Sequence, residues 1–417
     1  MAGDWEETTL GAEVDLLTGF PFKSERYINS DDSIRLLRGD NIIQGALRWN
    51  GAKKWPLAES AELGLYLLRE GDVVLAMDRP WIEAGLKYAS ISRYDLPCLL
   101  VQRTARLRGG PNLDAGFLRY LVGSRDFTQH IHAITTGTAV PHISGKQIKD
   151  FSFAHPPLAE QKAIAAVLGA LDDKIELNRR MNATLEAMAR ALFQSWFVDF
   201  DPVRAKLDGR QPTGLDEATA ALFPATFQES PLGPIPHGWG VKSLGEMIEL
   251  AYGKPLKAED RKNGSVCVYG ANGPVGWHDE KLVNGPGIVV GRKGNPGVVT
   301  WAHGDFYPID TTFYVVPIGD CRSLYFLYYA LSVHDLANLS ADSAVPGLNR
   351  NHAYMSKQVI PSQPVLKAFD SQISPIFAAV YASEEQSRTL ATLRDTLLPK
   401  LLRGELTPRR RHETYRD

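Results

Sequence analysis

The sequence predicts an α+β protein with two globular domains, separated by two long helices packed as an antiparallel coiled coil. Each domain is expected to hold a mixed, mostly antiparallel sheet and helices. One observation behind this prediction is a long internal repeat, and another is a heptad-spaced helical segment after each copy. The third is that each copy consists of short β-rich runs broken by Gly, Pro and Asn.

The internal repeat is clearest near the start of each half. Residues 10–23 align without gaps with residues 244–257, an offset of 234 with six identities in fourteen positions. Farther on, Ala139-Val140-Pro141 recurs as Ala344-Val345-Pro346, an offset of 205. Because the halves share both their beginnings and their ends, the sequence indicates one scaffold used twice with different contents, as a pseudo-twofold internal repeat.

A helix with the seam of a coiled coil follows each copy. Apolar residues recur at alternating spacings of four and three, which is the heptad pattern of packed helices. A polar pair lies at the centre of each seam, Asn178/Asn182 and Ser383/Ser387, and the pairs face each other if the helices run antiparallel. Simple solvation of these four residues is the alternative. The apolar seam residues are Ile164, Leu168, Leu171, Ile175, Leu185, Leu192, Trp196, Ile373, Ile376, Val380, Leu390, Leu397 and Leu401.

Punctuation by Pro and Gly divides the chain into segments. Short β-rich runs such as 72–76, 287–290 and 312–316 are followed in each half by an apolar helix, at 115–122 and 324–332. The boundaries that we predict are a first globular domain at 1–155, a first long helix at 156–200, a Pro/Gly-rich linker at 201–238, a second globular domain at 239–363, a second long helix at 364–406 and a basic tail at 407–417.

Composition excludes several classes of protein. A formal net charge of −2 with 44% hydrophobic residues argues against a disordered chain and against a protein that coats nucleic acid non-specifically. The three cysteines lie far apart, so no disulfide framework or metal knuckle is expected and a cytoplasmic location fits best. The acidic N-terminus lacks the pattern of a signal peptide, and no apolar run is long enough to span a membrane.

Catalytic motifs are missing from the sequence. It lacks the Asn/Asp-Pro-Pro-Tyr/Phe motif of adenine methyltransferases and the phosphate-binding loop of a motor subunit. Asp260-Arg261-Lys262 has the carboxylate-x-lysine spacing of a metal-dependent nuclease, but no Pro-Asp partner precedes it. The ten histidines show no metal-ligand spacing. We therefore expect no catalytic residue, no metal and no cofactor.

Three segments together resemble the specificity (S) subunit of type I restriction-modification enzymes. The first is PPLAEQKAI at 156–164 running on to LFQSWFVDF at 192–200. The second is YGANGPVG at 269–276 followed by GRKGNPG at 291–297, and the third is LLPKLLRGEL at 397–406. Each segment is a weak signal by itself, but their ordered combination is specific and covers nearly the whole chain.

The resemblance implies a non-catalytic DNA-binding specificity subunit. The two globular domains would be target-recognition domains, each reading one half of a bipartite site in double-stranded DNA. The long helices would be spacer helices, which set the distance between the readers and dock methyltransferase (M) subunits, two of them by the resemblance. Restriction (R) subunits would be recruited through that complex. A protein-binding scaffold, or a self-contained restriction endonuclease or methyltransferase, are the alternatives.

The loops expected to face DNA are Gly-rich and stand at corresponding places in the two halves. Arg and Lys suit phosphates and guanine edges, and Asn suits adenine. At each position an ordinary turn residue or a solvated charge is the alternative. The candidates are Lys23, Arg79, Thr138, His142, Lys146, Lys257, Arg292, Lys293, Asn295, Asn349 and Arg350.

Overall fold

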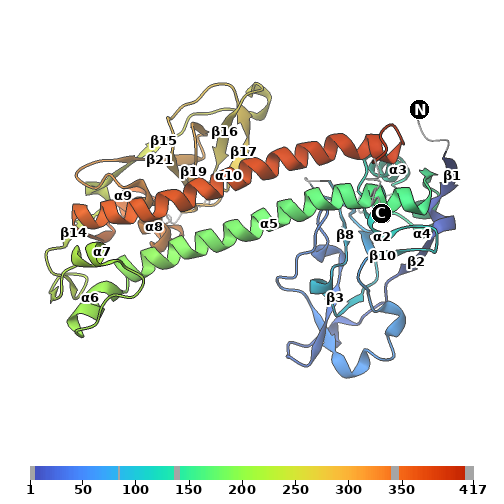
Figure 1. Cartoon of the computed structure of the whole chain (residues 1–417), viewed down its shortest axis with the longest axis horizontal. Helices are drawn as coiled ribbons and strands as arrows, with labels where there is room; N and C mark the ends of the chain where they lie inside the picture. The colour runs from blue at the N-terminus through green and yellow to red at the C-terminus, as the bar shows by residue number, and fades with distance from the viewer. Residues whose placement is uncertain (1–4, 83–84, 136–140, 340–346, 409–417) are drawn as a thin grey trace, which may run out of the picture. The chain divides into compact units, whose positions relative to one another are not determined.

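The computed structural model describes residues 5–82, 85–135, 141–339 and 347–408 (Figure 1). It divides into two compact units: unit 1 is Met1–Glu176 together with Gln386–Asp417, and unit 2 is Leu177–Glu385. The candidate Thr138 lies outside the described residues, as do residues 139–140 and 344–346 of the repeated Ala-Val-Pro segments.

Unit 1 is built on a four-stranded antiparallel sheet in the order β2-β10-β5-β8. A second sheet, β4-β3-β9, has one parallel pair, and β1 pairs with β11. The elements are β1 (Glu6–Thr9), α1 (Leu10–Glu13), β2 (Val14–Thr18), β3 (Ser33–Leu37), β4 (Lys54–Pro56), β5 (Val73–Ala76), β6 (Trp81–Ile82), β7 (Gly85–Leu86), β8 (Tyr88–Ser90), β9 (Cys98–Leu100), β10 (Thr104–Gly109), α2 (Ala115–Val122), α3 (Arg125–Ile134), α4 (Gly145–Lys149) and β11 (Ser152–His155).

Unit 2 repeats these three sheets, whereas the pair β6-β7 belongs to unit 1 and the pair β12-β13 to unit 2. Its antiparallel sheet has the order β15-β21-β18-β19, its mixed sheet is β17-β16-β20 with one parallel pair, and β14 pairs with β22. The elements are α6 (Asp201–Leu207), α7 (Glu217–Ala221), β12 (Phe227–Gln228), β13 (Ile235–Pro236), β14 (Gly240–Ser243), β15 (Ile248–Tyr252), β16 (Val266–Gly270), β17 (Gly273–His278), β18 (Gly287–Gly291), β19 (Val299–Ala302), β20 (Phe306–Pro308), β21 (Thr312–Pro317), α8 (Leu324–Val333), α9 (Arg350–Met355) and β22 (Lys357–Ile360).

The fold class predicted from the sequence is therefore confirmed, and the repeat reaches well beyond the segments that are similar in sequence. One detail differs from the expectation of a single sheet in each domain. The strands of each unit divide between an antiparallel sheet and a mixed sheet, because β3 and β16 each add a parallel neighbour to their antiparallel one.

Two helices of 40 residues each, α5 (Leu158–Phe197) and α10 (Gln363–Leu402), contribute to both units and run antiparallel within each of them. In unit 1, Ile164 and Leu168 of α5 share a core with Leu401 of α10. In unit 2, the Asn178 amide donates to the Ser383 carbonyl at 3.3 Å, and the Asn182 amide donates to the Val380 carbonyl at 3.4 Å. Every apolar seam residue predicted from the heptad spacing is buried or half-buried.

The core of unit 1 lies between the antiparallel sheet and the helices. Leu75 and Leu107 of the sheet, Phe117 of α2 and Leu168 of α5 are all fully buried there. The core of unit 2 is aromatic, with Phe193 of α5 packed at ring-centroid distances of 5.7 Å from Phe326 and 6.1 Å from Phe369.

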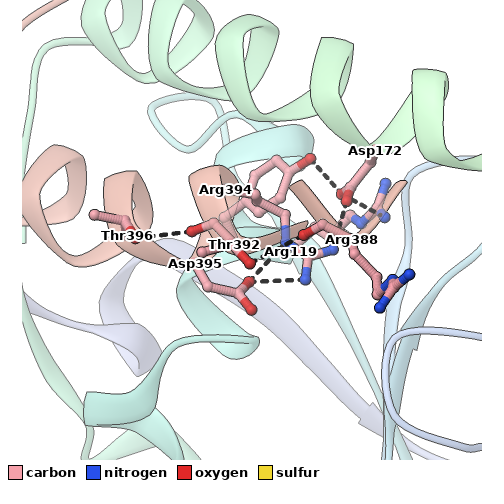
Figure 2. Close-up of polar contacts among 8 residues, drawn as sticks. Arg119, Asp172, Arg388, Thr392, Arg394, Asp395 and Thr396 are labelled. Carbon is pink, nitrogen blue, oxygen red and sulfur yellow. Dashed lines mark hydrogen bonds and ion pairs between the residues drawn. The ribbon is translucent and has the colours of Figure 1, made fainter. Parts of the chain in front are cut away.

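A polar cluster in unit 1 fastens α2 to both long helices (Figure 2). Asp172 of α5 accepts hydrogen bonds from Tyr120 Oη at 2.7 Å, Arg119 Nη2 at 3.0 Å and Arg394 Nη1 of α10 at 2.8 Å. Burial and the hydrogen bond to Asp172 raise the pKa of the Tyr120 hydroxyl, which therefore remains a donor. Arg394 also contacts the exposed carboxylate of Asp395 at 2.7 Å.

Neither of the long helices, nor any other helix in the described ranges, has an apolar stretch that could cross a bilayer. Among the same residues, no three His, Cys, Asp or Glu side chains gather in a way that could hold a metal ion.

Candidate nucleic-acid interface

The first candidate interface is the loop junction where β5 ends in unit 1. The Met77 amide donates to the Arg103 carbonyl at 2.9 Å, and the Met77 carbonyl accepts from the Ile143 amide at 2.9 Å. These bonds join the end of β5 to the segment that enters α4. They bring together the candidates Arg79 and His142, since the Arg79 amide also donates to the Pro141 carbonyl at 2.8 Å.

The same junction recurs in unit 2 at the end of β18. The Arg292 amide donates to the Thr311 carbonyl at 2.9 Å, and the Arg292 carbonyl accepts from the Leu348 amide at 2.9 Å. The backbone of Lys293 forms an antiparallel β-bridge with Gly347, as the backbone of Asp78 does with His142 in unit 1. The backbone that carries Arg292, Lys293, Asn349 and Arg350 is thus equivalent to the backbone that carries the unit 1 candidates.

One equivalent pair of side chains at the two junctions, Asp78 and Lys293, has opposite charge. In unit 1, Asp78 contacts Arg103 Nε at 3.2 Å and His142 Nδ1 at 2.5 Å, so this carboxylate is already partnered. The equivalent position in unit 2 is the exposed Lys293, next to Arg292. One scaffold therefore presents two different sets of polar groups at the same place, as the sequence analysis anticipated for a duplicated chain with unlike contents.

An aromatic residue that the sequence analysis did not single out organises the unit 2 junction. Tyr252, at the end of β15, is 51% exposed, and the guanidinium groups of Arg292 and Arg350 lie 5.0 Å and 5.2 Å from its ring centroid. Arg292 Nη1 donates to the Asp310 carbonyl at 2.8 Å, and Arg350 Nη1 to the Leu250 carbonyl at 3.4 Å. These contacts hold two cations on one aromatic ring, with their remaining N–H groups available.

The candidates Lys23 and Lys257 are exposed and belong to a second pair of equivalent loops. Each of these loops starts at a glycine that no other residue could replace without displacing the backbone. A Cβ atom on Gly19 would lie 2.1 Å from the Val101 carbonyl oxygen, and one on Gly253 would lie 2.2 Å from the Ile309 oxygen. The two glycines of the sequence repeat are explained by this close approach.

The remaining candidates differ in what the structure lets them do. Lys146 is exposed on α4, and Asn295 is exposed in the loop after β18. The Asn349 side chain caps α9, because its Oδ1 accepts from the Asn351 and His352 amides at 3.0 and 3.2 Å. This cap gives Asn349 a structural role in α9, which the sequence analysis had not assigned to it.

The chain is similar to known proteins in both sequence and fold. The family model described as the type I restriction modification DNA specificity domain matches residues 57–187 and 236–389, once in each half. The HindI specificity subunit of Haemophilus influenzae, a type I restriction enzyme component, is 28% identical over 359 residues, covering 70% of this chain and 77% of that protein. The MjaIX specificity subunit of Methanocaldococcus jannaschii is 25% identical over 315 residues, with coverages of 70% and 68%. The crystal structure of the S subunit from M. genitalium has the same fold, with a TM-score of 0.57, 18% identity and 96% coverage of both chains.

Proposed function

This chain belongs to the type I restriction-modification DNA specificity family, and from that premise we propose that its two units read the two halves of a bipartite site in double-stranded DNA. As a specificity subunit it is a DNA-recognition subunit and not a catalytic one. We assign the reading of each half-site to residues 1–155 and 239–363, and within them to the junction loops after β5 and β18.

The observation that supports this proposal is the duplicated junction. Equivalent hydrogen bonds fix the backbone at Met77 and at Arg292, whereas the side chains that project there differ in charge and in hydrogen-bonding capacity. A duplicated protein can read two different short DNA sequences if it holds two equivalent loops in place and gives them different side chains. Base readout depends on which donors and acceptors are presented, and phosphate contacts fix the register.

The modular assignment is tested by exchanging residues 1–155 for the corresponding region of a relative. Cells that express the exchanged chain with its methyltransferase subunits are expected to methylate sites in which only one half of the sequence has changed. Mapping the methylated adenines in their DNA measures this. The reciprocal exchange of residues 239–363 serves as the control and should change the other half. A change in both halves after either exchange would contradict the assignment.

The unit 2 junction is tested by removing the ring that holds its two arginines. Tyr252→Ala should weaken binding to the specific duplex roughly tenfold, because Arg292 and Arg350 lose a shared cation–π partner and become mobile. Tyr252→Phe keeps the ring and is the matched control, with affinity close to that of the wild-type chain. The affinities are measured by fluorescence anisotropy. If Tyr252→Ala binds as tightly as Tyr252→Phe, the ring of Tyr252 does not contribute to the interface.

We also propose that α5 and α10 dock the M subunits and that R subunits join through that complex. The supporting observation is that both helices leave apolar side chains exposed, among them Leu177, Met181 and Met188 of α5 and Leu393 of α10. Leu185 and Leu192, by contrast, lie in the seam, and Leu192 packs against the unit 2 core. A charge at Leu185 or Leu192 is expected to abolish assembly or to unfold unit 2, and normal assembly with normal stability would contradict the seam assignment.

A scaffold that binds only protein is the second candidate function. Its signature would be unchanged assembly with the M subunits and no preference among DNA sequences, even in the complete complex. Sequence-selective binding that is lost when residues 1–155 are deleted would favour the recognition subunit over the scaffold.

A further inference from the structure

Unit 1 contains a lysine that is buried without a counterion. Lys87, which directly precedes β8, is only 9% exposed. Among the described residues, its ammonium group has no hydrogen bond and no carboxylate within ion-pair distance. Holding an unpaired charge away from water is unfavourable, so an anion that reached this ammonium group would find a charge without a partner.

The backbone around Lys87 is firmly held. The Lys87 amide donates to the Pro80 carbonyl at 2.7 Å, and its carbonyl accepts from the Ala76 amide at 3.0 Å. The intervening β6–β7 hairpin is anchored by Trp81, whose ring stacks on His132 at a centroid distance of 3.6 Å. Since Pro80 follows Arg79, the hairpin closes with Arg79 at one end and Lys87 at the other.

A second loop brings more cations to the same place. Asn41 is buried, and its side chain accepts from the Arg38 amide at 3.0 Å and donates to the Arg48 carbonyl at 3.1 Å. The Gly45 amide of this loop donates to the Tyr88 carbonyl at 2.9 Å, which docks the loop next to Lys87. A Cβ atom on Gly39 would lie 3.8 Å from Lys87 Nζ, so the ammonium group lies beside this loop.

The charges gathered there are strongly unbalanced. We define the Lys87 cluster as Arg38, Asp40, Arg48, Arg79 and Lys87, which is four cations to one carboxylate. Asp40 is itself 72% exposed and is engaged by Arg38 Nη2 at 3.2 Å. Burial lowers the pKa of Lys87, Asp40 acts in the opposite direction, and Arg48 and Arg79 lower it further. The cluster therefore has an excess of positive charge that its one carboxylate does not balance.

We infer that the Lys87 cluster is a binding site for a backbone phosphate of DNA. The inference rests on the proposed DNA-reading function and deepens it, because it names a contact that fixes the position of unit 1 on the duplex without reading sequence. A phosphodiester is anionic and small enough to reach a recessed ammonium group, and Arg48 and Arg79, both exposed, would flank it.

The equivalent position in the described part of unit 2 has no lysine. In unit 1 the amide of Ala76, the last residue of β5, donates to the Lys87 carbonyl. In unit 2 the amide of Gly291, the last residue of β18, donates to the Val298 carbonyl. Val298 cannot bind an anion through its side chain. Unit 2 carries Arg292 and Lys293 directly after β18, so we expect phosphate contacts in the two units to come from non-equivalent residues.

The test is the affinity of the full chain for a random-sequence DNA duplex and for the specific duplex, measured at several salt concentrations. Lys87→Met should raise the Kd about tenfold for both duplexes alike. It should also reduce the slope of log K against log salt by about 0.9, which corresponds to one phosphate. Lys162→Met, at an exposed lysine of α5, is the control and should leave the Kd unchanged.

Two further variants separate a phosphate contact from a structural role of Lys87. Asp40→Asn removes the one carboxylate of the cluster at an exposed position, and should tighten binding to both duplexes. Burial lowers the pKa of Lys87, so the affinity of the wild-type chain should decline as pH rises towards the ordinary pKa of a lysine. Lys87→Arg should keep the affinity and lose this decline, because an arginine stays charged throughout.

The possible outcomes are distinguishable. A wild-type chain that binds no DNA would overturn the proposed function, and this inference with it. A wild-type chain that binds, with Lys87→Met and Asp40→Asn both unchanged, would overturn the inference alone. Weakening confined to the specific duplex would mean base reading and not phosphate binding. Inorganic phosphate that raises the melting temperature of the wild-type chain but not of Lys87→Met, while Lys87→Met keeps its DNA affinity, would identify free phosphate as the ligand. That result would also overturn the inference.

Discussion

Replacing Asp172 by alanine should loosen unit 1 selectively. The Asp172 side chain is 13% exposed and accepts hydrogen bonds from Tyr120, Arg119 and Arg394. Removing it leaves Arg394 without its interhelical partner and leaves the Tyr120 hydroxyl without its acceptor. Breaking a buried ion pair costs about 3–5 kcal/mol, and the partial exposure of both arginines places the expected cost near 3 kcal/mol.

Hydrogen exchange measured by mass spectrometry on the full chain resolves this loss locally. A cost of about 3 kcal/mol corresponds to roughly 150-fold faster exchange in the peptides of α2 and of residues 386–402. Peptides of α8 in unit 2 should exchange at the wild-type rate. At the position 205 residues after Asp172, unit 2 has the apolar Phe377, whose ring centroid lies 4.8 Å from that of Trp301, so this position has no equivalent of the Asp172 carboxylate.

Asp395→Ala is the matched control. Asp395 contacts the same arginine at 2.7 Å, but its side chain is 64% exposed, so its removal should cost no more than about 1 kcal/mol. Exchange rates that rise equally in both variants, or equally in both units, would refute the role given to the Asp172 cluster.

Three further predictions concern stability. Gly19→Ala should lower the free energy of unfolding by more than about 3 kcal/mol, because the new Cβ would meet the Val101 oxygen at 2.1 Å, whereas Gly64→Ala, with no atom within 4 Å, should be neutral in urea titrations. Leu168→Ala, at a fully buried seam position, should cost about 2–4 kcal/mol by the same measurement, against less than about 0.5 kcal/mol for Met188→Ala at a 56% exposed one. Burial lowers the pKa of His303 to about 4, so this residue is neutral in folded unit 2 and gains a proton on unfolding. The half-exposed Glu384, 3.8 Å away, does not offset that burial. His303 should therefore contribute a fall in stability of up to about 3 kcal/mol as pH drops from about 6.5 to about 4. The urea midpoint of a His303→Leu chain should fall less over this range than that of the wild-type chain, and equal falls would disprove the assignment.

The sequence was sufficient to predict the duplicated architecture, because its signals are periodic. Heptad spacing identified both 40-residue helices, and the aligned segments 10–23 and 244–257 start the same β–turn motif in each unit. Asp201-Pro202, in contrast, begins the predicted Pro/Gly-rich linker and forms the first turn of α6, a helix that was not predicted there. Proline is compatible with the first turn of a helix, so its presence could not decide between the two.

The candidate interface was only partly predictable. Arg292 and Lys293 were identified because they lie in a Gly-rich loop, but Tyr252 and Lys87 were not, since both lie within ordinary β-rich runs. Their significance comes from residues far away in the sequence: Arg350 reaches Tyr252, and the loop fastened by Asn41 reaches Lys87. Such approaches are set by tertiary structure, and single-sequence patterns carry no trace of them.

Unit 1 is assembled from two segments that are separated in the sequence by all of unit 2, and this has a consequence for biosynthesis. Leu401 is 4% exposed and completes the hydrophobic core that also contains Phe117 and Ile164. Unit 2 is continuous in sequence, so a ribosome can deliver all of it before residue 386 is made. The N-terminal half, although translated first, must wait with an open apolar surface until the final helix emerges. Premature termination in the last helix should therefore mark the nascent protein for chaperones or proteolysis by exposing the beginning of the chain.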